Sequence, residues 1–410
     1  MTQVHKRRGL GVALILAAVA ALAMATPMAA SATPSSSAAA APPCSISAPP
    51  VISSGHGHHL SGIIIAAGTS TCTGAGHKPP PEPAFNGTPP LLFHGSPPTC
   101  FFSPCEDGNV MMTASTGPLT VVPIFWDPTG YPMSSAYKNI IVSYLADVAK
   151  QSGHSQNVFS VLNEYSGNNG QIQYNVQLGS AINDTNAITS GCTLESNDTS
   201  GIYADGSGYS ACVDDAQLQA QVDSLTAANG LPHNLSHIYV LYLPKAVESC
   251  FLPGETTSVG PNGQFCTINH QPTAAYCAYH SEDPASAVYA NLAYPIYASP
   301  VGFTCGSDAR FPVVESPNGN PDADTEVSPT SHEVSEAITD PDTETGWYDS
   351  TGNEIGDECA YIFGQTQGAP GQLYNQDING LHFLTQEEFS NRDFAITGGG
   401  CVQSASAEAP

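Results

Sequence analysis

Residues 328–341 read SPTSHEVSEAITDP, and this stretch predicts the helix around which the rest of the fold is organised. Ser328 followed by Pro329 is typical of a helix start, with the serine as N-cap and the proline in the first turn. At the other end Asp340 precedes a proline, and a residue in that place avoids the helical region of backbone space. Apolar residues recur between these signals at the spacing of one helix face. We therefore expect a helix over residues 329–340.

The polar side of this helix has the spacing of a metal site. His332 and Glu336 are four residues apart, so their side chains project from one face, one turn apart. Glu333 follows the histidine directly, where a glutamate of a zinc hydrolase takes the proton of the attacking water. Two ligands are not enough, because a zinc site uses at least three protein side chains. The hypothesis therefore needs a third ligand from elsewhere in the chain.

The segment after the helix is rich in carboxylates that can supply this ligand. Residues 340–359 read DPDTETGWYDSTGNEIGDEC. A different interpretation of the same acidic loop is that Asp340, Asp342 and Asp349 hold Ca²⁺ structurally, because this cation prefers oxygen ligands.

Each site residue also has an interpretation without a metal. Residues 330–333, TSHE, match a capping box, in which Glu333 only closes the start of the helix. Glu336 then belongs to a solvated surface, and His332 is hydrogen-bonded on a half-buried face. His280, in the segment CAYHS, is expected either to line the cleft and stabilise an oxyanion or to be a structural histidine beside a disulfide.

The order of the other elements predicts a mixed α/β fold. Pro123 inside the strand pattern LTVVPIFW indicates an edge strand or a bulge. We expect one catalytic-type domain over residues 106–404, with a sheet part to residue 340 and a smaller, irregular C-terminal subdomain over 341–404. Strands are expected within residues 119–126, 170–179, 237–244, 274–281 and 288–297, and helices within 134–152, 157–166 and 214–232.

The first 32 residues carry a basic cluster, an apolar run and a small-x-small sequence, which together predict a secretory signal peptide. No other stretch is long and apolar enough to cross a bilayer. Cleavage removes three of the nine basic residues and none of the 36 acidic ones, so the mature chain carries a net charge of −30. Such a charge repels nucleic acid and anionic membranes. We expect a secreted, extracellular protein that binds neither.

Residues 33–105 are rich in Pro, Ser, Ala and Gly, which predicts a disordered linker or a propeptide-like arm. The chain has 12 cysteines, and an even number behind a signal peptide favours disulfides. Pairing of neighbours along the chain gives the bridges 44–72, 100–105, 192–212, 250–266, 277–305 and 359–401.

The motif HEVSE, the later NEIGD and the order of strands before the helix resemble the zincin metallopeptidases, over roughly residues 115–360. Those families have a histidine where this chain has Glu336. The element NEIGD is similar to the NExxSD element of thermolysin-type enzymes, which implies Glu354 as third metal ligand and Asp357 as its supporting carboxylate, or the two exchanged. Asp342 is the alternative third ligand, because it stands where metzincin-like patterns place theirs.

The segments VVPIFW, YKNIIVSYLADVA, CAYHS, EAITDP to GWYD, and EIGDEC also resemble the EXORDIUM-like, phosphate-induced secreted proteins of plants and their bacterial relatives. That family is extracellular and linked to growth responses. The resemblance implies a non-enzymatic binding or signalling protein, with a structural metal or none.

Two functional hypotheses follow. In the first, the chain is a secreted, zincin-like metallopeptidase that binds Zn²⁺ and cleaves protein or peptide substrates. His332 and Glu336 would bind the metal with Glu354 or Asp357, Glu333 would be the general base, and His280 would assist catalysis. In the second, the chain is an EXORDIUM-like extracellular binding protein.

Overall fold

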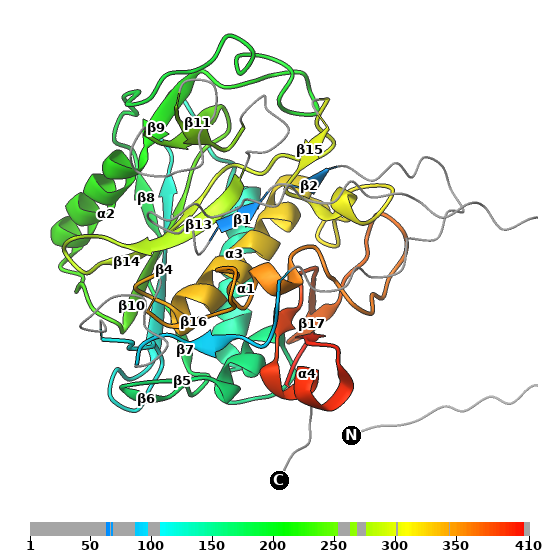
Figure 1. Ribbon diagram of the computed structural model, residues 1–410. Coiled ribbons are helices and arrows are strands. Elements are labelled where there is room, and N and C mark those ends of the chain that lie inside the picture. The colour runs from blue at the N-terminus through cyan, green and yellow to red at the C-terminus, as the bar shows by residue number, and fades with distance from the viewer. Residues whose placement is uncertain are drawn as a thin grey trace, which may run out of the picture. The chain divides into compact units, whose positions relative to one another are not determined.

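The computed structural model (Figure 1) describes residues 63–65, 67–68, 87–96, 107–252, 263–268, 276–300, 302–343 and 345–405. They all belong to one compact unit of the chain, residues 41–410. The predicted signal peptide and the predicted bridges Cys44–Cys72 and Cys100–Cys105 lie outside the described residues. In this described part, no helix has the length and apolar character needed to span a membrane.

A seven-stranded mixed sheet forms the centre of the molecule (Figure 1) and confirms the predicted mixed α/β class. Its strand order is β1-β13-β14-β10-β4-β7, and β8 also pairs with β4. Strands β14, β10, β4, β7 and β8 are parallel, whereas β13 runs antiparallel to both β14 and β1. In chain order these strands are β1 (Ile63–Ile65), β4 (Leu119–Trp126), β7 (Val176–Leu178), β8 (Ile182–Asp184), β10 (His237–Tyr242), β13 (Tyr276–Glu282) and β14 (Val288–Leu292).

Strand β4 lies inside the sheet, so the expectation of an edge position from Pro123 is wrong. On one side of the strand, Pro123 is paired with Val240 of β10. On the other side, β7 pairs with β4 as far as Val121, and β8 begins to pair at Ile124. The proline has no N–H to donate, and it falls in the gap between these two short partner strands.

Helices cover both faces of the sheet (Figure 1). Helices α1 (Ser135–Lys150) and α3 (Pro321–Thr339) pack on one face, and α2 (Asp215–Asn229) packs on the other. Successive strand residues point to opposite faces, so Val240 belongs to the core with α1 and α3, whereas Leu241 belongs to the core under α2. The result is a three-layer arrangement with α3 against the sheet.

Helix α3 begins earlier than the sequence predicted, at Pro321 and not at Pro329. Asn320 is the N-cap, and its side chain accepts a hydrogen bond from the backbone N–H of Ala323. Asn320 with Pro321 is thus the start that was assigned to Ser328 and Pro329, and Pro329 is tolerated inside the helix. The predicted end is confirmed, because Asp340 is the C-cap.

Two other predictions from local patterns need correction. The helix expected within 157–166 is a 3₁₀ helix, η1 (Val158–Glu164). The strand expected over 170–179 is reduced to a two-residue strand, β6 (Gly170–Gln171), and the three residues of β7. Helix α2 ends as expected, at a left-handed Gly230.

The segment after residue 340 is irregular, as predicted, but it is not a separate subdomain. Its apolar side chains, such as Ile355, Phe363 and Phe389, belong to the same core as α1 and α3. The elements here are β16 (Trp347–Tyr348), η3 (Asp357–Cys359), β17 (Gln376–Ile378), β18 (Leu381–Phe383), β19 (Glu388–Phe389), α4 (Asn391–Thr397) and β20 (Cys401–Val402).

Parts of the segment 33–105, predicted as a disordered arm, belong to the fold. Strand β1 pairs with β13, β2 (Ala67–Gly68) pairs with β15 (Phe303–Thr304), and β3 (Leu92–Phe93) pairs with β16. The prediction rested on the overall composition of this segment and overlooked short apolar runs within it, such as the three isoleucines of β1, that can pair at the edge of a sheet.

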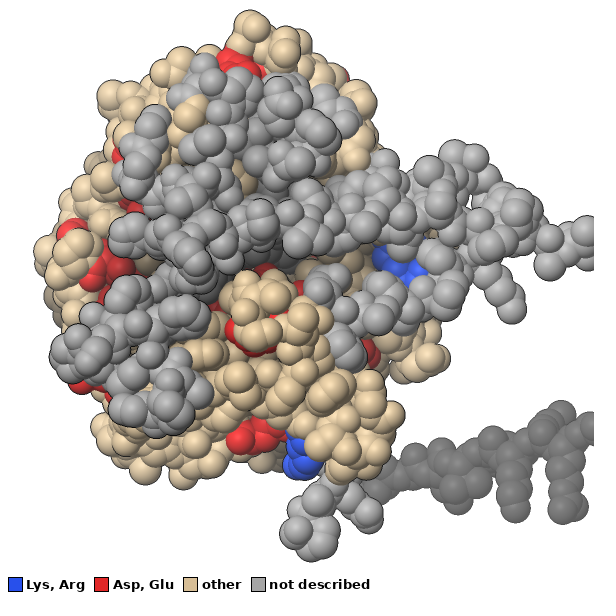
Figure 2. Space-filling view, viewed as in Figure 1, with Lys and Arg blue, Asp and Glu red and all other residues tan. Residues whose placement is uncertain are grey.

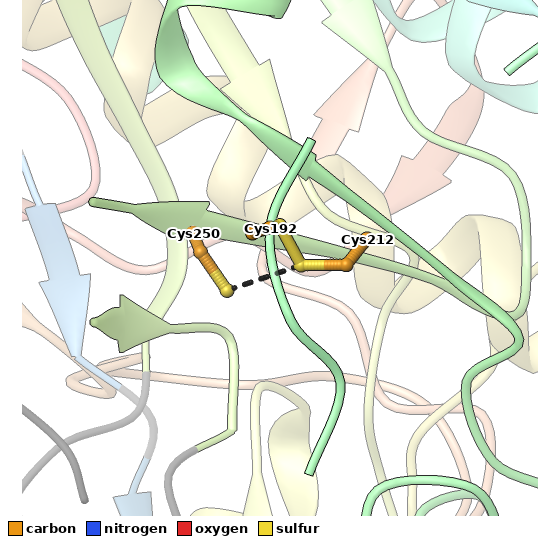
Figure 3. A group of neighbouring side chains, drawn as sticks. All are labelled: Cys192, Cys212 and Cys250. Carbon is orange, nitrogen blue, oxygen red and sulfur yellow. Dashed lines mark hydrogen bonds between the residues drawn. A yellow bond between two sulfur atoms is a disulfide. The ribbon is translucent and has the colours of Figure 1, made fainter. Parts of the chain in front are cut away.

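The four described disulfides are Cys192–Cys212, Cys250–Cys266, Cys277–Cys305 and Cys359–Cys401, and all four were predicted. The first two bridges are neighbours, with 3.4 Å between the Sγ atoms of Cys212 and Cys250 (Figure 3). Both bridges involve the small sheet of β9 (Ala211–Asp214), β11 (Val247–Phe251) and β12 (Phe265–Cys266). Cys250–Cys266 joins β11 to β12, and Cys192–Cys212 joins a preceding loop to β9. The remaining elements are β5 (Ser166–Gly167) and η2 (Ser307–Ala309).

Acidic side chains are scattered over the face of the molecule shown in Figure 2, and basic side chains are few there. This agrees with the composition of the whole chain, which has 36 acidic and nine basic residues.

Candidate metal centre

The predicted site residues of α3 face the interior and not solvent. His332, Glu333 and Glu336 all have an exposed fraction of 0%. Glu333 lies well inside the helix, so the capping-box interpretation of TSHE is wrong. The interpretation of Glu336 as a solvated surface residue is wrong as well.

The His332 side chain meets two carboxylates from different parts of the chain. Its Nε2 lies 2.9 Å from Glu336 Oε1 and 3.5 Å from Asp357 Oδ1. Two ligands bonded to a tetrahedral Zn²⁺ at about 2.1 Å lie about 3.4 Å apart. Ligand atoms of His332, Glu333 and Glu336 also lie within 4.8 Å of one another. His332, Glu333 and Glu336 could therefore hold a metal ion.

The turn that carries Asp357 is fixed against the helix. The Asp357 N–H donates to Glu336 Oε1 at 3.0 Å, and the Glu354 N–H donates to Asp357 Oδ2 at 3.3 Å. Gly356 between them packs on the imidazole, since a Cβ atom here would lie 2.6 Å from His332 Nδ1. The disulfide Cys359–Cys401 holds the far end of the turn.

Gln386 completes the environment of His332, and no sequence motif marks it. Its Nε2 lies 2.7 Å from His332 Nδ1 and donates to the Gly356 carbonyl oxygen at 2.8 Å. With the amide nitrogen in this position, the imidazole carries its proton on Nε2. A half-turn of the amide would present its oxygen to Nδ1 and free Nε2 for a cation.

His280 enters the same cluster from β13, with an exposed fraction of 1%. Its Nε2 lies 3.0 Å from the carbonyl oxygen of Asp340, and its Nδ1 lies 3.4 Å from Glu333 Oε2 and 3.7 Å from Glu336 Oε2. A carbonyl oxygen can only accept, so Nε2 carries the proton. In this geometry the proton of His280 is used by the backbone and is not directed at a substrate oxyanion.

Glu354 is the third buried carboxylate of the cluster. Neither of its oxygens has a hydrogen-bond partner among the described residues, and its exposed fraction is 0%. Its Oε1 lies 3.8 Å from His280 Nε2. Of the two predicted third ligands, Asp357 therefore faces His332, whereas Glu354 faces His280.

Burial and mutual repulsion shift the protonation of the cluster. Burial raises the pKa of Glu336 to about 7, although His332 opposes this shift. Burial, with the Glu336 carboxylate, raises the pKa of Glu354 well above its usual range. Burial lowers the pKa of His332, but Glu336 and Asp357 raise it by more. Burial also lowers the pKa of His280, to about 4.

These shifts have one physical origin. Within the described residues, histidine is the only cationic partner of Glu336 and Glu354. A buried carboxylate without a compensating charge is unfavourable by several kcal/mol, so it either takes up a proton or binds a cation. A divalent cation would replace the protons and satisfy the unpartnered oxygens, so the donor set fits a metal.

Glu388 of β19 is a further buried carboxylate that the sequence did not reveal. Its exposed fraction is 0%, and burial raises its pKa well above the usual range. His332 lowers this pKa, whereas Glu336 raises it. Burial thus favours the neutral, protonated form of this carboxyl group. In the sequence FLTQEEF it follows Glu387 and precedes Phe389, and nothing there distinguishes it from a surface glutamate.

The carboxylates proposed for Ca²⁺ have other partners. Asp340 Oδ1 accepts hydrogen bonds from the N–H groups of Thr345 and Gly346. Asp349 accepts from the N–H groups of residues 88, 351 and 353. Among the described residues, no group of three ligand atoms within 4.8 Å includes Asp340, Asp342 or Asp349.

Asp342, the alternative third ligand, instead lines a cavity of about 530 Å³ together with Glu282 and Pro341. Two of these lining residues are close in sequence to the cluster. Glu282 follows His280 by two residues, and Pro341 directly follows Asp340, the C-cap of α3.

Comparison with known proteins gives no relative from which a role can be transferred. The chain matches no protein-family model, no curated protein and no solved structure.

Proposed function

We propose that this chain is a secreted, divalent-metal-dependent hydrolase, and that its substrates are proteins or peptides. The observation that carries the proposal is the place of His332 Nε2, which lies 2.9 Å from Glu336 Oε1 and 3.5 Å from Asp357 Oδ1. Ligand atoms of His332, Glu333 and Glu336 lie within 4.8 Å of one another. One histidine with two carboxylates suits Zn²⁺ and somewhat harder divalent ions.

The residues have distinct parts in this proposal. His332, Glu336 and Asp357 would hold the cation, which when bound would supply a Lewis acid for the scissile carbonyl and would lower the pKa of a water nucleophile. Glu333, one residue round the helix, takes the proton from that water and passes it to the leaving amine. Gly356 and Gln386 orient the imidazole. The 12% exposed side chain of Asp357 is the part of the set that solvent reaches.

The test combines metal analysis with a variant of the general base. The full chain, secreted and purified without chelators, should contain stoichiometric divalent metal and cleave casein or a peptide library. Glu333→Gln should keep the metal and lose at least about 100-fold in kcat, because general-base catalysis contributes at least that factor. Glu248→Gln, at an equally buried glutamate of β11, is the matched control and should remain active. Metal-free wild-type protein would end the proposal at its first step.

A structural metal in an extracellular binding protein is the second candidate function. It is favoured by the complete burial of His332, Glu333 and Glu336. In that case the purified protein contains metal and its removal lowers the melting temperature, but no peptide is cleaved, and Glu333→Gln changes only stability.

A further inference from the structure

His280, a buried residue of strand β13, forms one side of the cluster. The Nε2–H of His280 points to the Asp340 carbonyl oxygen at 3.0 Å, which leaves a lone pair on Nδ1. A metal-binding histidine has this arrangement, because it donates its other ring N–H to a backbone carbonyl or a carboxylate.

The Nδ1 atom of His280 faces the oxygens of two carboxylates. Glu333 Oε2 lies at 3.4 Å and Glu336 Oε2 at 3.7 Å, and all three side chains are fully buried. Lone pairs that face one another in a buried site repel, and a positive charge between them removes the repulsion. Either a proton or a cation must therefore lie between these atoms.

Glu354 supplies a further ligand on this side. Ligand atoms of His280, Glu336 and Glu354 lie within 4.8 Å of one another. Both oxygens of Glu354 and Oε2 of Glu336 have no hydrogen-bond partner among the described residues. These buried, unpartnered oxygens lie beside His280, with Glu336 Oε2 3.7 Å from its Nδ1 and Glu354 Oε1 3.8 Å from its Nε2.

Glu336 divides its two oxygens between the two histidines. Oε1 lies 2.9 Å from His332 Nε2, and Oε2 lies 3.7 Å from His280 Nδ1. A carboxylate placed in this way can bridge two ions, and pairs of ions in hydrolases lie about 3.5–4 Å apart.

We propose that the centre binds two divalent cations, with the second held by His280 Nδ1, Glu354 and the bridging Glu336. The donors are one imidazole and two carboxylates, which suits Zn²⁺ or Mn²⁺. This inference rests on the proposed function, because the first ion is the one at His332. The second ion orients Glu336 and offers a second contact for the substrate oxygen.

The experiment is a metal count on the full chain. Chelator-treated protein is titrated with Zn²⁺ by calorimetry, and the bound zinc is then measured by mass spectrometry after dialysis. Wild type should bind two ions per chain. His280→Ala and Glu354→Gln should each bind one, whereas Glu315→Gln, at a buried glutamate outside the cluster, should still bind two.

The outcomes separate this inference from the proposed function. One ion in wild type, or two ions in His280→Ala, overturns the second site and leaves the first intact. No bound metal overturns both. Because the variants can fail to fold, the wild type loaded with Mn²⁺ gives an independent readout by electron paramagnetic resonance. Bridged ions give a spin-coupled spectrum, and the six-line spectrum of isolated Mn²⁺ at full loading contradicts the proposal.

Discussion

Gly356→Ala is the substitution whose effect on the centre follows most directly from the structure. Gly356 has helical backbone angles, φ −80° and ψ −39°, so alanine is allowed there and only the added methyl group matters. Its Cβ would lie 2.6 Å from His332 Nδ1 and 2.8 Å from Cγ of the same ring. Ordinary contact begins at 3.4 Å, so the ring or the turn must move by the difference, 0.8 Å.

That displacement is larger than a ligand set tolerates. Catalytic and metal sites hold their geometry to within about 0.5 Å. The imidazole cannot move away freely, because Gln386 lies against its Nδ1 and the helix fixes its backbone. We expect the affinity for Zn²⁺ to fall by about 10–100-fold, as it does when the support of a metal-binding histidine is lost, or by about 1.4–2.8 kcal/mol.

The assay is a competition titration of the metal-free protein against a chromogenic zinc chelator. Gly130→Ala is the matched control, because Gly130 is exposed and a Cβ there meets nothing within 4 Å. Circular dichroism at the assay temperature establishes that both variants are folded. A folded Gly356→Ala protein that binds zinc as tightly as wild type would refute the assignment of His332 as a ligand.

Three further predictions concern stability. Burial raises the pKa of Glu248 well above 4.5, so its contribution to stability is intact below about pH 4.5 and is lost as the pH rises; Glu248→Gln should be more stable than wild type to urea at pH 8 but not at pH 4. Replacing Cys359 and Cys401 with serine opens a bridge of sequence separation 42, which should reduce the free energy of unfolding by about 4 kcal/mol and also weaken zinc binding; an unchanged calorimetric melting temperature would contradict this. Thr88→Val removes the hydroxyl that donates to Asp349 at 3.0 Å, and should lower the free energy of unfolding by about 0.5–1.5 kcal/mol in urea titrations; no change would mean that this contact does not stabilise the fold.

The parts of the fold that the sequence predicted correctly depend on local signals. Gly230 ends α2 in the left-handed conformation that the sequence indicated, and Asp340 before a proline ends α3. The four described disulfides join cysteines that are neighbours in the sequence, so chain proximity was enough to pair them. The carboxylate-rich segment was recognised by its residue types, and Glu354 and Asp357 were singled out within it by the resemblance of NEIGD to the NExxSD element.

The errors have a common cause, which is that partners distant in sequence decide the outcome. Pro123 is acceptable inside the sheet only because β7 and β8 leave a gap beside it. Pro329 looked like a helix start, but Asn320 provides a better cap eight residues before Ser328. Gln386 reaches His332 from 54 residues away, and a lone glutamine carries no motif.

The turn around Asp357 meets helix α3 at the proposed metal site, where the Asp357 N–H donates to Glu336 Oε1 at 3.0 Å. The most direct measurement is therefore anomalous diffraction at the zinc edge from crystals of protein purified without chelators. The proposed zinc site predicts an anomalous peak about 2.0–2.2 Å from His332 Nε2 and from oxygens of Glu336 and Asp357. Crystals soaked in Zn²⁺ that show no such peak, with His332 Nε2 still 2.9 Å from Glu336 Oε1, would contradict it.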